Sequence, residues 1–331
     1  MTHSPLKFTL ADVFFRDQAA VGASGDLSIV LNRISLAARI IANDVMKAGL
    51  HGQLGYTGDV NVQGEDVRAL DLIANDVFIR VFEPVESVCA MASEEMDDVH
   101  YFKGCEQGKY VVLHDPLDGS GNVDIDGSMG TIFSVHRRKS TDRPPTVEDM
   151  FRLGSEQVAA GYVLYGPATV FVYTVGAAVH GFTLDRSVGA FFLTHPELRI
   201  PEGKGSYAVN EANEPKWNEA TQELVRRFRA GETECGKRSA RYVGALVADF
   251  HRTLIQGGIY MYPGTTEKPN GKLRLLYEAA PLAMIAECAG GVASNGRESI
   301  LSIQPTELHQ RTPLFIGARP DVEEAERALR G

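Results

Sequence analysis

The chain has 331 residues, of which 44% are hydrophobic, and its formal net charge is −10. This composition is typical of a globular protein with one large domain or two medium ones. The acidic balance argues against nucleic acid and against an anionic membrane as partners. No run of about 18 apolar residues occurs, and the opening MTHSPLKF has no apolar signal core, so we expect a cytoplasmic protein.

The first expected helix is Ser28–Lys47, preceded by a loose N-terminal arm over residues 1–28 and ended by Gly49. Its apolar residues recur at helical spacing, which predicts one inward face. That face consists of Val30, Ile34, Ala37, Ile41 and Val45.

The second expected helix is 66–82, and Asp71 is its residue of interest. Its apolar stripe is predicted to be Leu70, Ile73, Val77 and Val81. Asp71 borders this stripe, on the side that carries Val67, Ala74 and Phe78. A half-buried acid in such a place can act as a base, although it is more often only a boundary polar group.

Two expected strands run directly into acidic residues. The apolar run Ser87–Ala92 leads into Ser93-Glu94-Glu95, and the apolar run 111–113 leads into the turn DPLDGSGN at 115–122. In open α/β sheets, ligands bind at the ends of strands. A solvated acidic turn is the competing interpretation for each cluster alone, and it explains the nearby Asp97 and Asp98 well. It explains an apolar strand that ends in Glu94 less well.

The turn after the second strand favours a metal site. Asp115 and Asp118 are three residues apart in a glycine-rich turn, so both can point at one place. Like charges this close repel and raise one pKa. A hard divalent cation removes that repulsion, and Mg²⁺ prefers carboxylate, carbonyl and water oxygens.

The rest of the chain changes pattern near residue 196. Before it, Gly, Pro and Asp separate successive strands, as in a meander, and Lys139–Gly154 is a polar surface excursion. These strands are expected at 109–114, 130–137, 158–165, 170–175, 179–184 and 189–193. After it, strands at 205–210, 258–262, 291–294 and 313–317 alternate with helices at 217–230, 242–256, 281–290 and 321–330. The alternation is typical of an α/β protein, and we place a domain boundary there, giving domains 1–195 and 196–331.

Three details of the second half concern possible site residues. Pro281 belongs in a first helical turn, so a helix Leu282–Ala289 begins there with Glu278 at its entrance. Lys272 and Arg274 alternate, so both face one side if the segment is extended; an ordinary amphipathic surface strand is the alternative. Arg241 lies off an inward stripe expected to contain Val243, Leu246, Val247 and Phe250.

Five sequence blocks resemble class I fructose-1,6-bisphosphatase, part of the lithium-sensitive sugar-phosphatase group that includes inositol monophosphatases. The blocks are SEE at 93–95, DPLDGSGN at 115–122, GTIFSVHRR at 130–138, ARYVGALVADFHRTL at 240–254 and GKLRLLYEAAPLAMIAECAGG at 271–291. They keep their order between about residues 20 and 320. The acidic turn alone would identify only the larger group, whereas GKLRLLYE and ARYVG are more specific. The resemblance implies an α/β (α+β layered), two-domain sugar-phosphatase fold with stacked helix and sheet layers.

The resemblance also implies a role for individual residues. Two or more Mg²⁺ ions per subunit would be held by Glu94, Glu95, Asp115, Asp118, Glu278 and the carbonyl oxygen of Leu117. The attacking water would be activated by Asp71 and Glu95. The 1-phosphate would be bound by Asp118, by the amides of Gly119 and Ser120, and by Arg274. Lys272 would reach the sugar, and the 6-phosphate would be bound by Asn210, Tyr242, Tyr262 and an Arg241 extended from a neighbouring subunit.

Two positions depart from the family pattern. Gly121 replaces the serine usual in the turn, which keeps the turn but removes a hydroxyl near the phosphate. Asn213 replaces a tyrosine that helps to bind the 6-phosphate. The reaction implied is Mg²⁺-dependent hydrolysis of the 1-phosphate of fructose 1,6-bisphosphate, in gluconeogenesis or the Calvin cycle. Asn213 leaves room for a related sugar phosphatase, acting on sedoheptulose 1,7-bisphosphate or an inositol phosphate. A catalytically silent effector-binding protein is a further alternative, against which the complete acid set argues.

Regulation is the last property that the resemblance implies. Members of the family form homotetramers and are inhibited by AMP, which binds near the N-terminus. The matching positions here are Ser24, Gly25, Asp26, Leu27, Ser28, Lys109, Tyr110 and Arg137. A Gly25-led loop that opens a helix is typical of an N-terminal phosphate cradle. A plain capped helix start is the competing interpretation.

Overall fold

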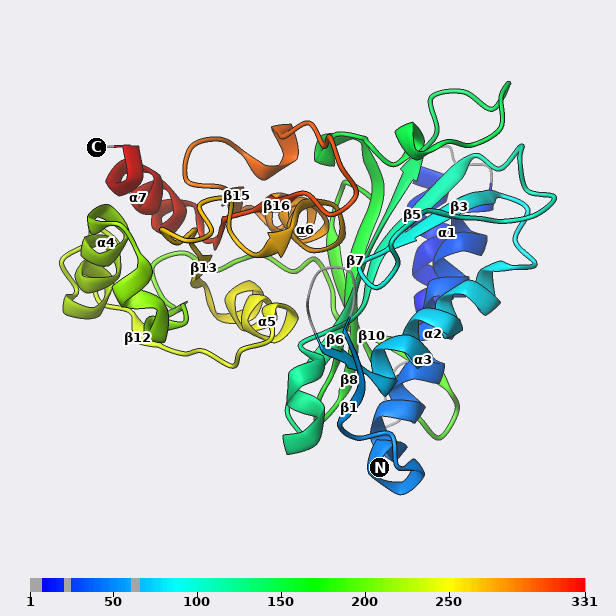
Figure 1. The fold of residues 1–331 in the computed structure, drawn as a ribbon, viewed down its shortest axis with the longest axis horizontal. Helices are drawn as coiled ribbons and strands as arrows, with labels where there is room; N and C mark the ends of the chain where they lie inside the picture. The colour runs from blue at the N-terminus through cyan, green and yellow to red at the C-terminus, as the bar shows by residue number, and fades with distance from the viewer. Residues whose placement is uncertain (1–7, 21–24, 61–65, 331) are drawn as a thin grey trace.

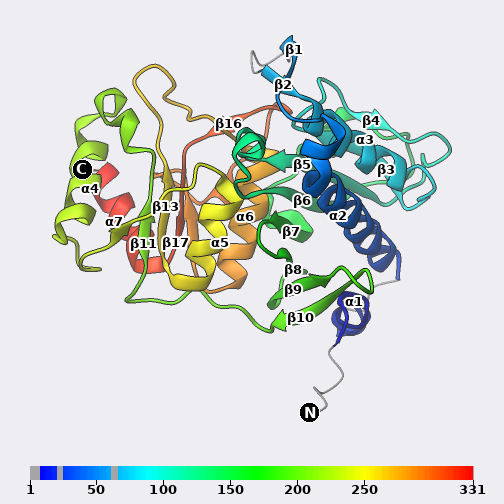
Figure 2. The ribbon, with the colours of Figure 1, turned by 90° about the horizontal axis from the view of Figure 1, so that it is seen from below.

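The computed structural model describes residues 8–20, 25–60 and 66–330, which form alternating layers of helix and sheet (Figures 1 and 2). Helices α1–α3 cover one face of an eight-stranded sheet, and helices α5 and α6 cover its other face. A five-stranded sheet follows, and α4 and α7 close its outer side. The predicted α/β fold with stacked helix and sheet layers is therefore confirmed.

The first helical layer consists of three helices that bury apolar faces against the large sheet. They are α1 (Leu10–Ala20), α2 (Asp26–His51) and α3 (Ala69–Phe82). Helix α2 buries Val30, Ile34, Ala37 and Ile41 as predicted, but continues past Gly49. It ends at Gly52, whose φ of 66° suits a left-handed C-cap.

Two predictions about this layer are wrong. Residues 10–20 are helical rather than a loose arm, because Leu10, Val13 and Phe14 form a short apolar face that packs on the sheet. Helix α3 begins at Ala69, since β1 (Tyr56–Val60) pairs with β2 (Asp66–Arg68) before it. Its most buried face is the side of Asp71 and not the side of Ile73.

The eight-stranded sheet confirms the predicted meander. Its order is β10-β9-β8-β7-β6-β5-β3-β4, antiparallel throughout except that β3 and β5 are parallel. The strands are β3 (Val88–Ser93), β4 (His100–Tyr101), β5 (Tyr110–Asp118), β6 (Met129–Arg137), β7 (Gln157–Tyr165), β8 (Thr169–Thr174), β9 (Val179–Asp185) and β10 (Ala190–His195). Short 3₁₀ turns lie between them at η1 (Ser120–Ile125), η2 (Val147–Asp149) and η3 (Gly154–Glu156).

The expected surface excursion after β6 is partly wrong. Asp149 and Met150 are buried, because Met150 packs under the sheet edge and Asp149 accepts a bidentate pair of hydrogen bonds from Arg143. Asp149 Oδ2 also lies 3.5 Å from Nε of Arg138, a buried side chain just after β6, so a buried acid ties the segment to the domain and the segment is not solvated along its whole length.

The second sheet has the order β12-β11-β13-β17-β15 and mixes parallel and antiparallel pairs. Its strands are β11 (Ser206–Ala208), β12 (Ser239–Ala240), β13 (Gly258–Tyr262), β15 (Val292–Ser294) and β17 (Leu314–Gly317), with β14 (Leu273–Arg274) and β16 (Arg311–Thr312) as a separate pair. The helices are α4 (Glu219–Ala230), α5 (Leu246–Gln256), α6 (Ala280–Cys288) and α7 (Arg319–Arg330). Shorter turns are η4 (Glu211–Lys216), the π-turn η5 (Leu275–Ala279) and η6 (Ile300–Ser302).

Helix α5 begins four residues later than predicted. The Asp249 carboxylate accepts the backbone N–H groups of Val243 and Gly244, and Gly244 has a φ of 88°, so the chain turns there before it becomes helical. Val243 is consequently exposed rather than part of the inward stripe, whereas Leu246, Val247 and Phe250 are buried as predicted. Among the described helices, none is both long enough and apolar enough to cross a bilayer.

Candidate active site

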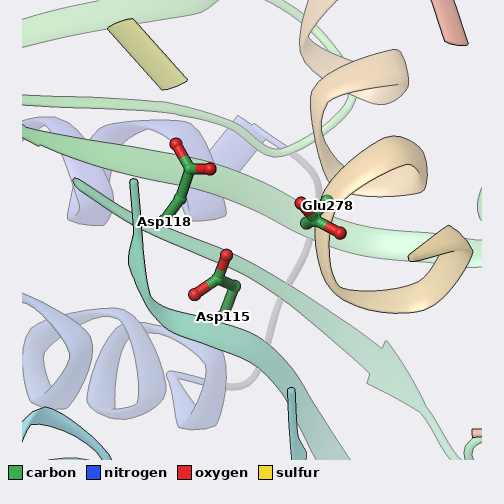
Figure 3. A group of neighbouring side chains, drawn as sticks. All are labelled: Asp115, Asp118 and Glu278. Carbon is green, nitrogen blue, oxygen red and sulfur yellow. The ribbon is translucent and has the colours of Figure 1, made fainter. Parts of the chain in front are cut away.

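The site is built around three buried carboxylates where the large sheet meets α6. Asp115 and Asp118 lie at the end of β5, and Glu278 lies in the π-turn before α6. One oxygen from each lies within 4.8 Å of the others, and Figure 3 shows the side chains converging. The two aspartates and the glutamate are thus brought together as predicted, from segments about 160 residues apart in the chain.

Backbone N–H groups hold each of these carboxylates. Leu117 donates to Asp115 Oδ1 at 3.0 Å, and Val247 at the start of α5 donates to Asp118 Oδ2 at 2.7 Å. Arg274 N–H donates to Glu278 Oε2 across the π-turn that precedes α6. The carboxylates are therefore oriented before any ligand arrives.

The turn after Asp118 requires glycine at 119. Gly119 has a φ of 75°, and a Cβ there would lie 2.4 Å from the Ala245 Cβ. The close approach lets the end of β5 pack directly on the segment that leads into α5. Gly119 and Ser120 then open the short turn η1, with Gly119 as its N-cap.

Glu94 and Glu95 reach the same edge from the neighbouring strand. Because β3 and β5 are parallel, their C-terminal ends lie side by side, as the sequence predicted. Glu94 is buried and pairs with Arg274, Oε1 to Nη2 at 2.7 Å, whereas Glu95 is half-buried. The predicted 1-phosphate arginine is therefore itself buried next to the acids.

Crowding of buried acids raises their pKa values. Burial is the main cause that raises the pKa of Glu95 and of Glu278 to about 8, and the Glu94 charge acts on both in the same direction. Burial is also the main cause that raises the pKa of Asp118 to about 7 and that of Asp115 well above its usual range. An all-oxygen donor set under this repulsion fits a hard divalent cation, since the cation's charge would relieve it.

Asp71 is a closer neighbour of the cluster than the sequence indicated. It is 5% exposed, in the first turn of α3, and its carboxylate accepts hydrogen bonds from the Ser120 side chain and the Arg68 backbone. Burial, and after it the Glu94 charge, raise its pKa to about 7. The sequence predicted that Asp71 borders the buried apolar stripe of its helix. Apolar residues occur on more than one face of this helix, and its contacts with the sheet decide which face is buried.

A cavity of about 360 Å³ adjoins β13 and is lined by several of the predicted substrate residues. Asn210, Tyr262 and Lys272 line it, together with Asn213, the residue that departs from the family pattern. Lys216 and Lys268 also line the cavity and were not predicted as substrate-binding residues. The only feature of the sequence that could have indicated them is their positive charge near a loop that contains prolines. Lys216 pairs with Glu267 at 3.0 Å on the rim.

Three other predicted substrate residues, Arg241, Tyr242 and Arg274, are not among the residues that line this cavity. Lys272 is exposed and Arg274 buried, so the two alternating basic residues serve the cavity and the acidic cluster respectively. Tyr242 is 40% exposed, and its pKa is raised to about 12 by burial and then by nearby Tyr262. Arg241 is exposed, with Nη1 donating to the Ala240 carbonyl at 2.7 Å.

The residues predicted to bind AMP gather at the opposite end of β5. Lys109 Nζ lies 2.6 Å from Asp26 Oδ2, and Tyr110 pairs with Arg137 across β5 and β6. Gly25, with a φ of 84°, opens α2, in which Leu27 and Ser28 are buried. Ser24 lies outside the described residues. Tyr110 begins β5, whereas Asp115 and Asp118 follow five and eight residues further along it, so this group lies about 17 to 26 Å from the two aspartates along the strand.

Comparison with known proteins agrees with this geometry. The family model for the fructose-1-6-bisphosphatase N-terminal domain matches residues 8–196, and that for the C-terminal domain matches residues 200–330. The class 1 fructose-1,6-bisphosphatase of Trichormus variabilis is 49% identical over 303 residues, covering 91% of this chain and 86% of that protein. That of Nitratidesulfovibrio vulgaris is 51% identical over 310 residues, covering 92% of each.

A solved structure gives the same result. The holo form of Leishmania major fructose-1,6-bisphosphatase superposes with a TM-score of 0.92 at 39% identity, covering 98% of this chain and 99% of that one. The fold and the matches define the chain as a phosphatase. It belongs to the class 1 fructose-1,6-bisphosphatase family.

Proposed function

We propose that the protein hydrolyses the 1-phosphate of fructose 1,6-bisphosphate, giving fructose 6-phosphate and inorganic phosphate, with Mg²⁺ as cofactor. The observation that carries the proposal is the buried cluster Asp115, Asp118 and Glu278, close to a separate basic cavity, in a chain of this family. One site suits a metal-assisted phosphoryl transfer, and the other suits a second phosphate on the same substrate.

Two or more Mg²⁺ ions would be held by Glu94, Glu95, Asp115, Asp118, Glu278 and the Leu117 carbonyl. When bound, such ions neutralise phosphoryl oxygens and lower the pKa of a bound water. Asp71, with its pKa near 7, is suited to accept the proton of that water, together with Glu95. The N–H groups at Gly119 and Ser120 and the Arg274 guanidinium would bind the 1-phosphate.

The 6-phosphate and the sugar would occupy the cavity next to β13. Asn210 and Tyr262 line this cavity and offer donors to the phosphate, as does Tyr242 near Tyr262, and Lys272 offers a donor to the sugar. Asn213 lines the same cavity, and its amide can donate to a phosphate in place of the tyrosine hydroxyl.

Domain roles and regulation complete the proposal. Residues 1–195 would carry the metal site, except for its ligand Glu278, and an AMP site at 24–28, 109, 110 and 137, and residues 196–331 would carry the sugar-phosphate site. We further propose a cytoplasmic homotetramer, inhibited by AMP, that serves gluconeogenesis or the Calvin cycle. Support for the AMP site is the grouping of Asp26, Lys109, Tyr110 and Arg137.

A phosphate-release assay with Mg²⁺ tests the substrate. We expect the protein to hydrolyse fructose 1,6-bisphosphate with at least about a hundredfold higher kcat/KM than fructose 6-phosphate or inositol monophosphate, because a second bound phosphate contributes several charge-assisted hydrogen bonds. Sedoheptulose 1,7-bisphosphate belongs in the same panel as the alternative bisphosphate. If any monophosphate were hydrolysed with a kcat/KM comparable to that for fructose 1,6-bisphosphate, the cavity next to β13 would not bind a second phosphate as proposed.

A further inference from the structure

A β-bulge places Thr131 opposite the acidic turn. The register of β5 on β6 slips by one residue between Asp115 and Asp118, so that Pro116 and Leu117 together lie opposite Thr131. A bulge leaves backbone groups without a partner in the ladder. The Pro116 carbonyl, beside the metal cluster, therefore needs a hydrogen-bond donor from a side chain.

Two buried hydroxyl groups provide that donor and its support. Thr131 Oγ1 donates to the Pro116 carbonyl oxygen at 2.8 Å, and the Tyr165 hydroxyl lies 2.8 Å from the same Oγ1. A threonine hydroxyl has one proton, which is used on the carbonyl, so Tyr165 is the donor in the second bond. Burial raises the pKa of Tyr165, which keeps its hydroxyl protonated.

The hydrogen bonds continue through a peptide to a carboxylate. The Pro116 C=O and the Leu117 N–H belong to one planar peptide unit. The same Leu117 N–H donates to Asp115 Oδ1 at 3.0 Å. Thr131 therefore fixes the plane of the peptide that orients Asp115, and bonds in such a series strengthen one another.

We propose that Thr131 and Tyr165 are positioning residues for the metal centre, which hold Asp115 at the angle at which it binds the cation. The inference rests on the proposed function, because it takes Asp115 as a metal ligand. Thr131 is 0% exposed and Tyr165 4%, so neither hydroxyl can exchange its bond for water. Outer partners of this kind change metal affinity or activity by about 10- to 100-fold.

Direct Mn²⁺ binding to the metal-free protein, measured by calorimetry, tests the proposal without turnover. Thr131→Val removes the hydroxyl and keeps the shape, and we expect it to raise the Kd for Mn²⁺ about 10- to 100-fold. Thr131→Ser should restore most of the affinity. Tyr165→Phe keeps the bond from Thr131 to Pro116 and removes only its support, so we expect a smaller rise in Kd of about threefold or more.

Thr253→Val is the matched control, because Thr253 is 1% exposed and its hydroxyl donates to the Asp249 carbonyl in α5 at 3.0 Å. Thermal unfolding in EDTA compares folding among the variants. Unchanged Mn²⁺ affinity in Thr131→Val, or an equal loss in Thr253→Val, overturns the inference. If Thr131→Val does not fold, Tyr165→Phe decides, and wild-type affinity there overturns it. A wild-type protein that binds no Mn²⁺ instead refutes the metal site and the proposed function with it.

Discussion

Asp118 shows how one residue can belong to both halves of the site. It ends β5 of the large sheet, and its carboxylate accepts the N–H of Val247, in the first turn of α5 beside the second sheet. The same group is one of the three converging carboxylates. A change at this residue therefore tests the chemistry of the site, provided that the bond from Val247 is kept.

Asp118→Asn meets that condition, because the amide oxygen can still accept from Val247 N–H. We expect phosphatase activity to fall at least about a hundredfold, since an amide gives the cation no charge, while thermal unfolding shows a folded protein. Asp97→Asn is the control, because Asp97 is an exposed acid of the neighbouring loop. Substantial Mg²⁺-dependent turnover by Asp118→Asn would show that the metal assignment is wrong.

The residues of the site differ in how far their positions could be predicted from the sequence. Glu94 and Asp115 were predicted to share one site because apolar strands run directly into both acidic clusters, and the parallel pairing of β3 with β5 places those strand ends at one edge. The hydrogen bond from Thr131 to Pro116 has no such local signal, because it depends on a bulge that forms only when β6 pairs with β5. Asp71 lies between these cases: its helix was predicted, but its burial depends on the sheet below.

At the scale of elements, the segment that joins β5 to η1 contains two glycines that differ in their surroundings. Gly119 has a φ of 75° and lies against Ala245. A side-chain carbon added at Gly121 would meet no atom within 4 Å, and the φ of Gly121 is not positive. The sequence predicted a tight turn here but not which glycine is indispensable, since the contact with Ala245 comes from a segment far along the chain.

Exchanging each glycine for alanine separates their roles. We expect Gly119→Ala to destabilise the protein by about 2–4 kcal/mol, from backbone strain and overpacking, and to reduce activity. Gly121→Ala should change stability by less than about 0.5 kcal/mol. Denaturant unfolding and phosphate release measure both. Equal effects of the two changes would contradict the role assigned to the Gly119–Ala245 contact.

Elements with long, regular patterns were predicted better than short ones. The meander from β5 to β10 and helix α2 follow from alternation and helical spacing over many residues. Helix α1 was missed because its buried face contains only Leu10, Val13 and Phe14, which is too short a pattern to distinguish from a loop. The π-turn before α6 was missed because Pro281 indicates only where a helix begins and not how the backbone turns before it.

At the scale of the whole molecule, the acidic cluster links stability to pH and to metal. Burial raises the pKa of Asp118 to about 7 and those of Glu95 and Glu278 to about 8, against ordinary values of 3.8 for aspartate and 4.5 for glutamate. At pH values between the ordinary pKa and the raised pKa of each group, the folded state binds more protons than the unfolded state. The stability that these groups contribute is therefore present at low pH and lost as the pH rises through 7 and 8.

We accordingly expect the Tm of the protein in EDTA to fall by about 5 °C or more between pH 6 and pH 8.5. Mg²⁺ should reverse most of that fall, because a cation at 100 times its Kd stabilises the folded state by about 2.7 kcal/mol. In Asp118→Asn the fall should be smaller and the effect of Mg²⁺ largely lost. A Tm in EDTA that rises over this pH range would contradict the clustering of buried acids.

The surface around Arg241 makes a prediction about assembly. Arg241, Tyr242, Val243 and Gly244 form an exposed run between β12 and α5, and Tyr242 and Val243 are large apolar side chains left partly uncovered. A guanidinium on such a run can reach a neighbouring subunit and bind two phosphate oxygens with its planar fork. The bland alternative is a solvent-exposed arginine that contributes under about 1 kcal/mol.

Mixing two defective subunits distinguishes these alternatives. We expect Arg241→Ala to raise KM for fructose 1,6-bisphosphate about tenfold or more, because a charge-assisted hydrogen bond is lost, with kcat changed less. When Arg241→Ala subunits exchange with inactive Asp118→Asn subunits, some sites combine an intact Asp118 with a partner that retains Arg241. Low-KM activity should then return. The double variant, Asp118→Asn with Arg241→Ala, is the control for mixing, since it has no arginine to offer and should restore nothing. If exchange is demonstrated by mass spectrometry and low-KM activity does not return, Arg241 does not act across a subunit interface.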